Sequence, residues 1–192
     1  MVMTRKLYLD GCSMTYGKGL ERRESLGSLF RDIGGYRVYD QSRPAKSNAA
    51  IAVDTYNHYS DYDVFVLGFT YSSRFGLGYQ DQNINFYSGF HGKGLGLEPQ
   101  ELDLASTEVH KYFYTVFAPP WSEQFSDMLI DGLISFLIRQ NKTVLSFSWE
   151  LRSTSNKLLY PYIGPRHRLP DGHLNAEGMH VLFNYLQNQL NE

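Results

Sequence analysis

The fold of this chain is decided by the segment Leu7-Tyr8-Leu9-Asp10-Gly11-Cys12-Ser13-Met14-Thr15-Tyr16-Gly17. Its apolar beginning, residues 7–9, stops at Gly11, and this pattern predicts a short buried strand that ends in a tight turn. Gly11 accepts backbone angles that a Cβ forbids, and it allows another part of the chain to approach closely. Ser13 would lie on the turn at the carboxyl end of the strand, where an α/β protein can hold a nucleophile. Serines after strands are more often turn formers or helix caps, so this segment alone leaves both roles open.

Strands and helices are expected to alternate along the whole chain. Apolar runs predict four strands, at residues 5–10, 36–40, 63–68 and 144–149. Helical periodicity, caps and glycine stops predict helices at residues 25–33, 47–56, 107–117, 121–141 and 175–190. The alternation predicts a parallel sheet covered by helices on both faces, which is a three-layer α/β/α sandwich of the α/β class. Residues 1–192 would form this single domain.

One long insertion interrupts the alternation. Residues from about 73 to 104 are rich in Gly, Tyr, Phe and Asn and have no clear period. Irregular segments of this length in a compact domain are usually functional or mobile. We expect residues 73–100 to lie over or beside the functional site, as a cover or a contact surface. A surface excursion that packs its own aromatic rings explains the composition equally well.

Charge and cysteine content limit the classes of binding partner and the cellular compartment that we expect for this protein. With 18 basic and 20 acidic residues, the chain offers no general electrostatic attraction to nucleic acid or to an anionic membrane. Cys12 is the only cysteine, which excludes an internal disulfide and fits a reducing compartment. The sequence has no apolar stretch of signal-peptide or membrane-spanning length, so we expect a cytoplasmic protein. No His, Cys or Asp spacing suits a zinc site, and we expect neither a metal nor another cofactor.

A second segment, near the carboxyl end, supplies the partners that a serine nucleophile needs. It reads Leu169-Pro170-Asp171-Gly172-His173-Leu174-Asn175-Ala176-Glu177-Gly178-Met179. The loops that follow parallel strands share one edge of the sheet, so this segment and Ser13 are expected to meet there. A serine hydroxyl needs a base such as His173 to take its proton, and the base needs an acceptor such as Asp171 to hold its tautomer. Taken alone, His173 is more often a polar residue ahead of a helix.

Ser13, Asp171 and His173, in this order, resemble the SGNH (GDSL-type) hydrolase family. In that family Gly-Asp-Ser follows the first strand, and Asp and His precede the last helix. The resemblance covers nearly the whole chain and implies the flavodoxin-like fold of SGNH hydrolases. It also implies a serine esterase whose catalytic residues are Ser13, His173 and Asp171. The substrate it implies is a small-molecule or carbohydrate ester, with an O-acetyl group on a carbohydrate as the best single expectation.

The same resemblance implies donors for the oxyanion that acyl transfer creates. The amide of Ser13 is one donor, and a glycine amide and an asparagine side chain complete the hole in the family. The glycine position reads Ala45 here, which keeps an amide, and the asparagine position reads Thr70, whose hydroxyl can donate one bond. Asn48 could supply the missing side-chain donor, or it could serve as a helix cap.

Two further departures from the family pattern lie next to the expected catalytic residues. Cys12 replaces the aspartate that usually precedes the nucleophile, and we expect its thiol to be buried. Only Gly172 separates Asp171 from His173, whereas the family has two residues there. The carboxylate can therefore reach the imidazole only if the turn at Gly172 folds it back.

Substrate contacts are assigned to residues near the same sheet edge. Tyr16 and Arg74 are the candidate substrate-binding residues, and Arg166 and Arg168 could flank the site. An arginine there would suit an anionic group on the substrate. Taken alone, each arginine is more often a solvated surface residue.

Two non-enzymatic interpretations stay open. The replacements at Cys12, Ala45 and Thr70 could mark a fold that was kept for binding after activity was lost. The chain could also be a structural component whose aromatic insertion forms a partner interface. Turnover of a generic ester, with and without Ser13, would separate the esterase from both alternatives.

Overall fold

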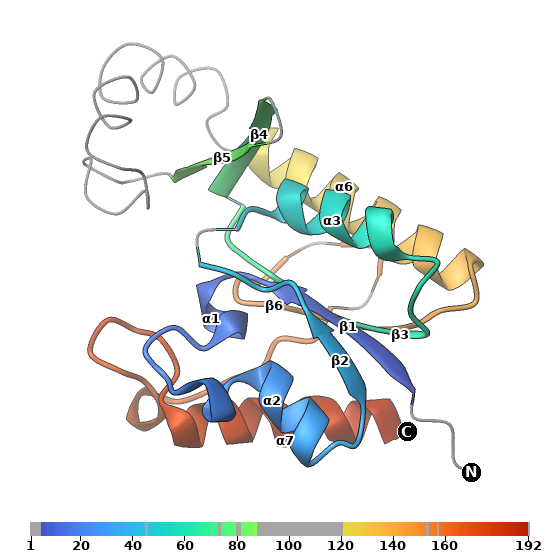
Figure 1. Ribbon diagram of the computed structural model, residues 1–192. Helices are drawn as coiled ribbons and strands as arrows, with labels where there is room; N and C mark the ends of the chain where they lie inside the picture. The colour runs from blue at the N-terminus through green and yellow to red at the C-terminus, as the bar shows by residue number, and fades with distance from the viewer. Residues whose placement is uncertain are drawn as a thin grey trace.

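A four-stranded parallel sheet forms the centre of the computed structural model, which describes residues 5–44, 46–72, 74–79, 82–87, 121–152, 154–156 and 158–191. Its strands lie in the order β2-β1-β3-β6 (Figure 1). They are β1 (Lys6–Gly11), β2 (Arg37–Asp40), β3 (Val64–Phe69) and β6 (Thr143–Ser148). All four expected strands are confirmed, with bounds that differ by about one residue. Every residue of β3 is buried, as the continuous apolar run predicts for a strand covered on both faces.

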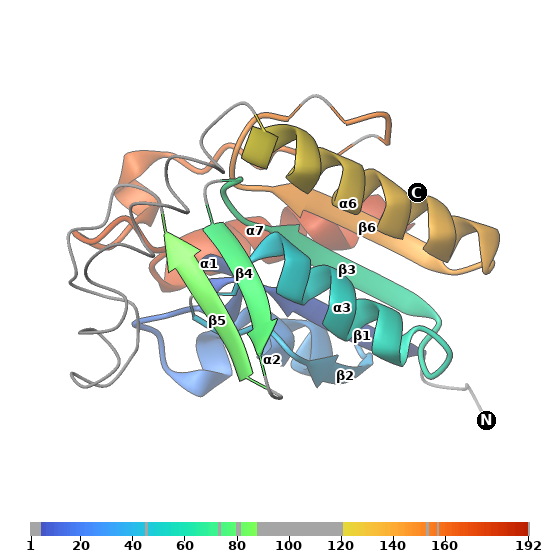
Figure 2. The ribbon, with the colours of Figure 1, turned by 90° about the horizontal axis from the view of Figure 1, so that it is seen from above.

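Helices cover both faces of this sheet, so the predicted three-layer α/β/α fold is confirmed. One face carries α2 (Leu26–Asp32) and α7 (Ala176–Asn191), and the other carries α3 (Asn48–His58) and α6 (Trp121–Arg139) (Figures 1 and 2). Alternate residues of β1 point to opposite layers. Leu7 and Leu9 join the core beneath α2 and α7, whereas Tyr8 joins the core beneath α3 and α6.

The helices begin where the sequence places polar caps. Ser25 Oγ accepts a hydrogen bond from the amide of Ser28. Ser47 Oγ accepts one from the amide of Ala50. A helix cap of this kind stabilises a protein by about 1 kcal/mol. Ser47 lies in the loop between β2 and α3, so its cap also fixes where that loop ends.

The insertion begins with regular structure that the sequence analysis did not predict. Strands β4 (Arg74–Tyr79) and β5 (Gln82–Tyr87) pair antiparallel in a separate two-stranded sheet. Gly76 faces Asn85, and Gly78 faces Asn83, in the register of this pair. Gly and Asn are depleted in strands, so they hide the alternation by which a strand is recognised. The expectation of an irregular segment is therefore wrong for these residues.

The hairpin lies next to α3, at the end of the molecule where the loops after the strands gather (Figures 1 and 2). The remainder of the insertion and the expected helix at 107–117 lie outside the described residues. In the described ranges, no helix combines the length and the apolar character that a membrane span requires.

Candidate functional site

Ser13 lies on a tight turn at the carboxyl end of β1. It is the first residue of the short helix α1 (Ser13–Tyr16), which Gly17 ends with a φ of 80°. The side chain of Thr15 lies against Gly11 of β1 and against its register partner Gly68 of β3. A Cβ at either glycine would collide with Thr15. The two glycines therefore let α1 turn back onto the sheet, through close approach and not through positive φ angles.

The structure brings Ser13 and His173 together from opposite ends of the chain. His173 Nε2 lies 3.0 Å from Ser13 Oγ, within hydrogen-bond distance. Ser13 is 5% exposed, so the hydroxyl is largely shielded from water. The expected approach of these two side chains is thus present in the structure.

A tight turn presents His173 to the serine. The amide of Leu169 donates to the carbonyl of His173 at 2.7 Å, and the amide of Gly172 donates to the carbonyl of Leu169 at 2.9 Å. Gly172 has a φ of 86°, which favours glycine over any residue with a Cβ. Arg168 Nη1 donates to the carbonyl of Gly172 at 2.8 Å and braces the turn from outside.

Asp171 reaches His173 in spite of the short spacing. Its Oδ1 accepts a hydrogen bond from the backbone amide of His173 at 3.2 Å, and this bond holds the pKa of the carboxyl below its usual range. Its Oδ2 lies 3.0 Å from His173 Nδ1, but Nδ1 has no partner in hydrogen-bond geometry. The carboxylate thus lies close to Nδ1 without an aligned hydrogen bond, and a hydrogen bond weakens steeply away from linearity. The carboxylate is also 54% exposed.

Asn48 does not offer the free oxyanion donor that the sequence analysis considered. Its Nδ2 donates to the carbonyl of Thr70 at 3.0 Å and to Ser126 Oγ at 2.8 Å, and its Oδ1 accepts from the amide of Thr70 at 2.8 Å. Arg152 Nη2 donates to the same Thr70 carbonyl at 2.7 Å. Both hydrogen-bond donors of the Asn48 amide are therefore in use, and this buried side chain connects α3 to the loop after β3.

The other candidate oxyanion donors belong to three different segments of the chain. The hydroxyl of Thr70 is fully buried and has no hydrogen-bond partner within the described part of the chain. Ala45 lies outside the described residues. The amide of Ser13 lies in the first turn of a helix, where backbone amides have no intrahelical acceptor.

The expected substrate-binding and flanking residues differ in their surroundings. Tyr16 is 46% exposed at the end of α1. Arg74 begins β4, and only its backbone is described. Arg166 Nε donates to His167 Nε2 at 3.0 Å, and Arg168 Nε donates to the carbonyl of Ile163 at 3.3 Å. Arg168 lies beside the site, but its guanidinium donates to the turn that carries His173 and to the carbonyl of Ile163.

Cys12 has a buried free thiol, as expected. Over the ranges that the structure covers, no group of three or more His, Cys, Asp or Glu side chains could hold a metal ion.

A buried ion pair beneath the site is the main feature that sequence reasoning missed. Lys46 Nζ lies 2.6 Å from both carboxylate oxygens of Asp10, and both side chains are fully buried. Asp10 Oδ1 also accepts from the amide of Gly11 at 2.7 Å, and Lys46 Nζ contacts Asp54 Oδ2 at 2.7 Å. Burial raises the pKa of Asp10 to about 7, against the opposing effect of the lysine.

This pair joins the loop after β2 to the end of β1, directly before the turn that carries Ser13. The only sequence signal for it is an aspartate that follows an apolar run. The lysine partner is 36 residues away and has no pattern of its own.

Comparisons with known proteins give structural likeness without close sequence relatives. No protein-family model matches the chain, and no curated protein matches it. A member of the lipolytic protein G-D-S-L family from Veillonella parvula is 10% identical, with a TM-score of 0.43 and 96% of each chain covered. Esterase EstA from Pseudoalteromonas is 10% identical, with a TM-score of 0.41 and coverage of 98% of this chain and 100% of the other. An acetylxylan esterase from Geobacillus stearothermophilus is 10% identical, with a TM-score of 0.38 and coverage of 100% and 97%.

Proposed function

We propose that this chain is a serine esterase of the SGNH type, which removes a small acyl group from a carbohydrate or similar ester. The observation that carries the proposal is the 3.0 Å separation of Ser13 Oγ and His173 Nε2 at the carboxyl edge of the parallel sheet. A hydroxyl paired in this way with an imidazole is the arrangement that acyl transfer requires. The acetyl group and the carbohydrate rest on the family resemblance alone.

In the proposed reaction His173 Nε2 takes the proton of Ser13 Oγ as the oxygen attacks the ester carbonyl. The carbonyl oxygen becomes an oxyanion, and the imidazolium then gives its proton to the leaving alcohol, which leaves an acyl-serine. Water, deprotonated by His173, attacks the acyl group, and the imidazolium returns the proton to Ser13 Oγ as the acid is released. The charge of Asp171, 3.0 Å from Nδ1, stabilises the imidazolium while it exists.

The oxyanion would be bound by the amide of Ser13 together with donors from the neighbouring loops. We assign the amide of Ala45 and the hydroxyl of Thr70 to this role. The buried, unpartnered Thr70 Oγ1 supports the second assignment, because buried hydroxyls normally have a partner. Such donors are worth about 3–4 kcal/mol each where they have been measured.

A fluorophosphonate ester tests the proposal, because its phosphorus reacts far faster with an activated serine than with an ordinary hydroxyl. We expect intact mass spectrometry to show one adduct per wild-type chain and peptide mapping to place it on Ser13. Ser60→Ala, which removes an exposed serine remote from the sheet edge, serves as the control and should label like the wild type. Absence of labelling, together with no turnover of any acyl ester, would replace the esterase with the binding-module interpretation.

Asp171→Asn should reduce kcat/KM on an aryl acetate by about 10- to 100-fold, which is less than loss of a fully aligned triad aspartate causes. The reason is that the carboxylate is half exposed and is not aligned with Nδ1. Asparagine keeps an oxygen that can accept the His173 amide, so the turn should survive. A loss as large as that of His173→Ala would show that the carboxylate aligns fully once substrate is bound.

A further inference from the structure

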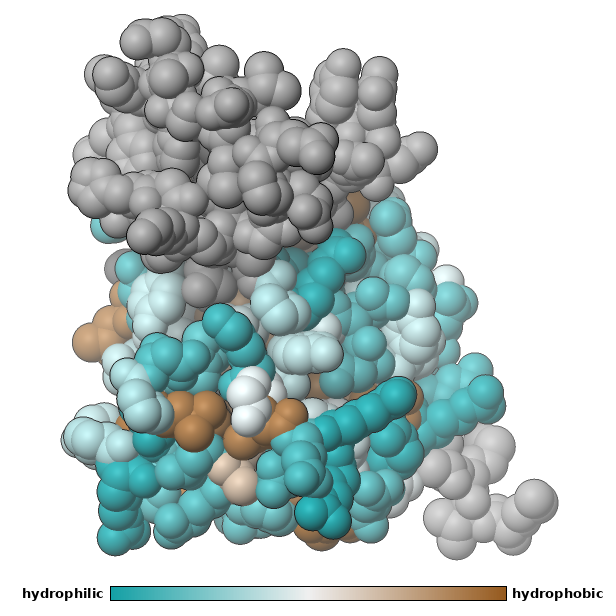
Figure 3. Space-filling model, turned by 60° about the vertical axis from the view of Figure 1, so that its left-hand side comes forward, coloured by the Kyte–Doolittle hydropathy of each residue, from teal (hydrophilic) through white to brown (hydrophobic). Residues whose placement is uncertain are grey.

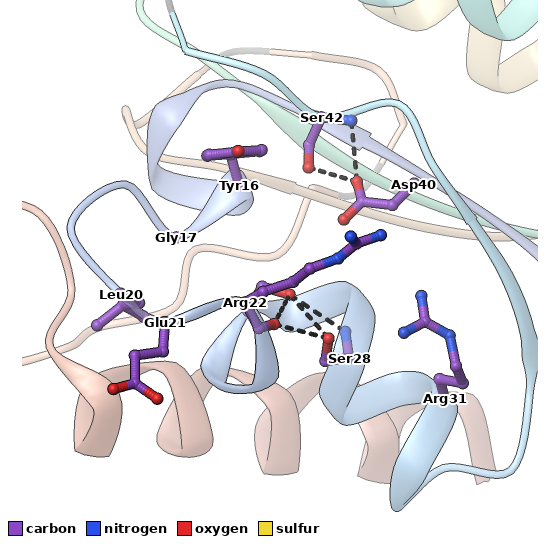
Figure 4. A pocket seen from close by; sticks show the side chains of 10 residues that line it. Tyr16, Gly17, Leu20, Glu21, Arg22, Ser28, Arg31, Asp40 and Ser42 are labelled. Carbon is purple, nitrogen blue, oxygen red and sulfur yellow. Dashed lines mark hydrogen bonds between the residues drawn. The ribbon is translucent and has the colours of Figure 1, made fainter.

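A cavity of about 460 Å³ lies beside the turn that carries Ser13. It is bordered by the segment after β1, through Tyr16 and Gly17, and by the end of β2 and the loop after it, through Asp40 and Ser42 (Figure 4). Tyr16 and Gly17 follow Ser13 by about one helical turn. The cavity therefore lies at the same sheet edge as the proposed nucleophile.

Two arginine side chains line this cavity. Arg22, from the short helix η1 (Arg22–Glu24), and Arg31, from α2, extend toward the side on which Asp40 lies (Figure 4). Among the described residues neither guanidinium has an ion-pair partner, whereas the neighbouring Arg23 pairs with Glu21 at 2.9 Å. Planar guanidinium groups bind carboxylate and phosphate through paired hydrogen bonds.

The acidic groups of the lining select among anions. Asp40 Oδ1 accepts from the amide of Ser42 at 2.9 Å and from its hydroxyl, which fixes the carboxyl group in the cavity wall. Burial raises the pKa of Asp40, while the charge of Arg31 opposes the rise. A dianion such as phosphate would be repelled by Asp40 and by Glu21 at the rim. A monoanion that also carries hydroxyl groups would pair with the arginines and donate to Asp40.

We propose that this cavity binds the carboxylate of an acidic sugar, so that the substrate of the proposed esterase is an acylated hexuronate-type carbohydrate. The identification of this ligand as a substrate rests on the proposed function. The binding site itself is argued from the residues that line the cavity. Tyr16, 46% exposed at the border of the cavity, offers a ring face for the sugar. Outside the grey residues, Figure 3 shows a face that is mostly hydrophilic, with a band of hydrophobic residues across it.

Binding is tested first, without any reaction. We expect calorimetric titration of the wild-type protein to show that methyl glucuronide binds at least about 10-fold more tightly than methyl glucoside or inorganic phosphate. The double variant Arg22→Gln/Arg31→Gln should lose this preference, whereas Arg23→Gln, which removes a charge from the next residue outside the cavity, should keep it. Equal binding of the two sugars to the wild type, or tighter binding of phosphate, would overturn the proposal.

Kinetics then separate this inference from the proposed function. The ratio of kcat/KM for O-acetylated methyl glucuronide to that for O-acetylated methyl glucoside should favour the acidic ester, and it should fall at least about 10-fold in the double variant. Melting temperatures confirm that the variants are folded. Hydrolysis of both esters at equal rates would refute the acidic substrate but leave the esterase intact. Tight binding of methyl glucuronide, with no fluorophosphonate labelling of Ser13 and no turnover of either ester or of an aryl acetate, would support the binding site and refute the esterase.

Discussion

Ser13→Ala should lower kcat/KM for a short-chain aryl acetate by at least about 10⁴-fold, because it removes the attacking oxygen. The fold should survive. The only side-chain partner of Ser13 Oγ in the described structure is His173, and one lost hydrogen bond costs about 1 kcal/mol. His173→Ala should cause a loss of similar size, since it removes the base at 3.0 Å from the same hydroxyl.

The double variant gives the sharper result. If Ser13 and His173 act as one unit, Ser13→Ala/His173→Ala should be scarcely slower than either single variant. Ser60→Ala and His180→Ala, both at exposed positions, should retain wild-type rates. The measurement is initial-rate kinetics with thermal melting in parallel. A folded Ser13→Ala protein that hydrolyses the ester at the wild-type rate would exclude Ser13 as the nucleophile.

Lys46→Met should reduce the free energy of unfolding by about 3–5 kcal/mol near pH 8, where Asp10 is charged in the wild type. The substitution preserves most of the side-chain volume but leaves the fully buried Asp10 without its cation. Urea unfolding curves followed by fluorescence measure the loss. Lys18→Met, at an exposed position, should change the unfolding free energy by less than about 0.5 kcal/mol.

The pH dependence identifies the cause of this loss. The folded-state pKa of Asp10, about 7, lies above the unfolded value near 4. The contribution of Asp10 to the free energy of unfolding is therefore largest below about pH 4, and it is lost as the pH rises toward 7. Without Lys46 the folded-state pKa of Asp10 rises further, because the lysine lowers this pKa through its charge and its hydrogen bond, whereas the burial that raises it remains. The deficit of Lys46→Met should therefore be smaller at about pH 5 than at about pH 8. Asp10→Asn in the same chain should recover part of it, and a deficit independent of pH would point to packing instead.

Local sequence patterns determined the architecture of this protein. The four strands follow from apolar runs, and the cap at Ser25 follows from a polar residue ahead of a helical period. These signals are readable because burial on a sheet face and helix capping depend on residues that are close in sequence. Gly76 and Gly78 in β4 mark the limit of this approach, because the pairing of that hairpin is not encoded in an apolar alternation.

Only the tertiary structure decided how the residues at the sheet edge are used. Asn48 and Thr70 were both candidate donors, yet in the fold the amide of one holds the backbone of the other. Lys46, a charged residue in an expected loop, lies fully buried on Asp10. Such assignments depend on which groups meet across 22 or 36 residues of chain and on which of them lose contact with water. A hydrogen bond or an ion pair is set by distance and burial in three dimensions, and neither quantity has a period that a sequence can display.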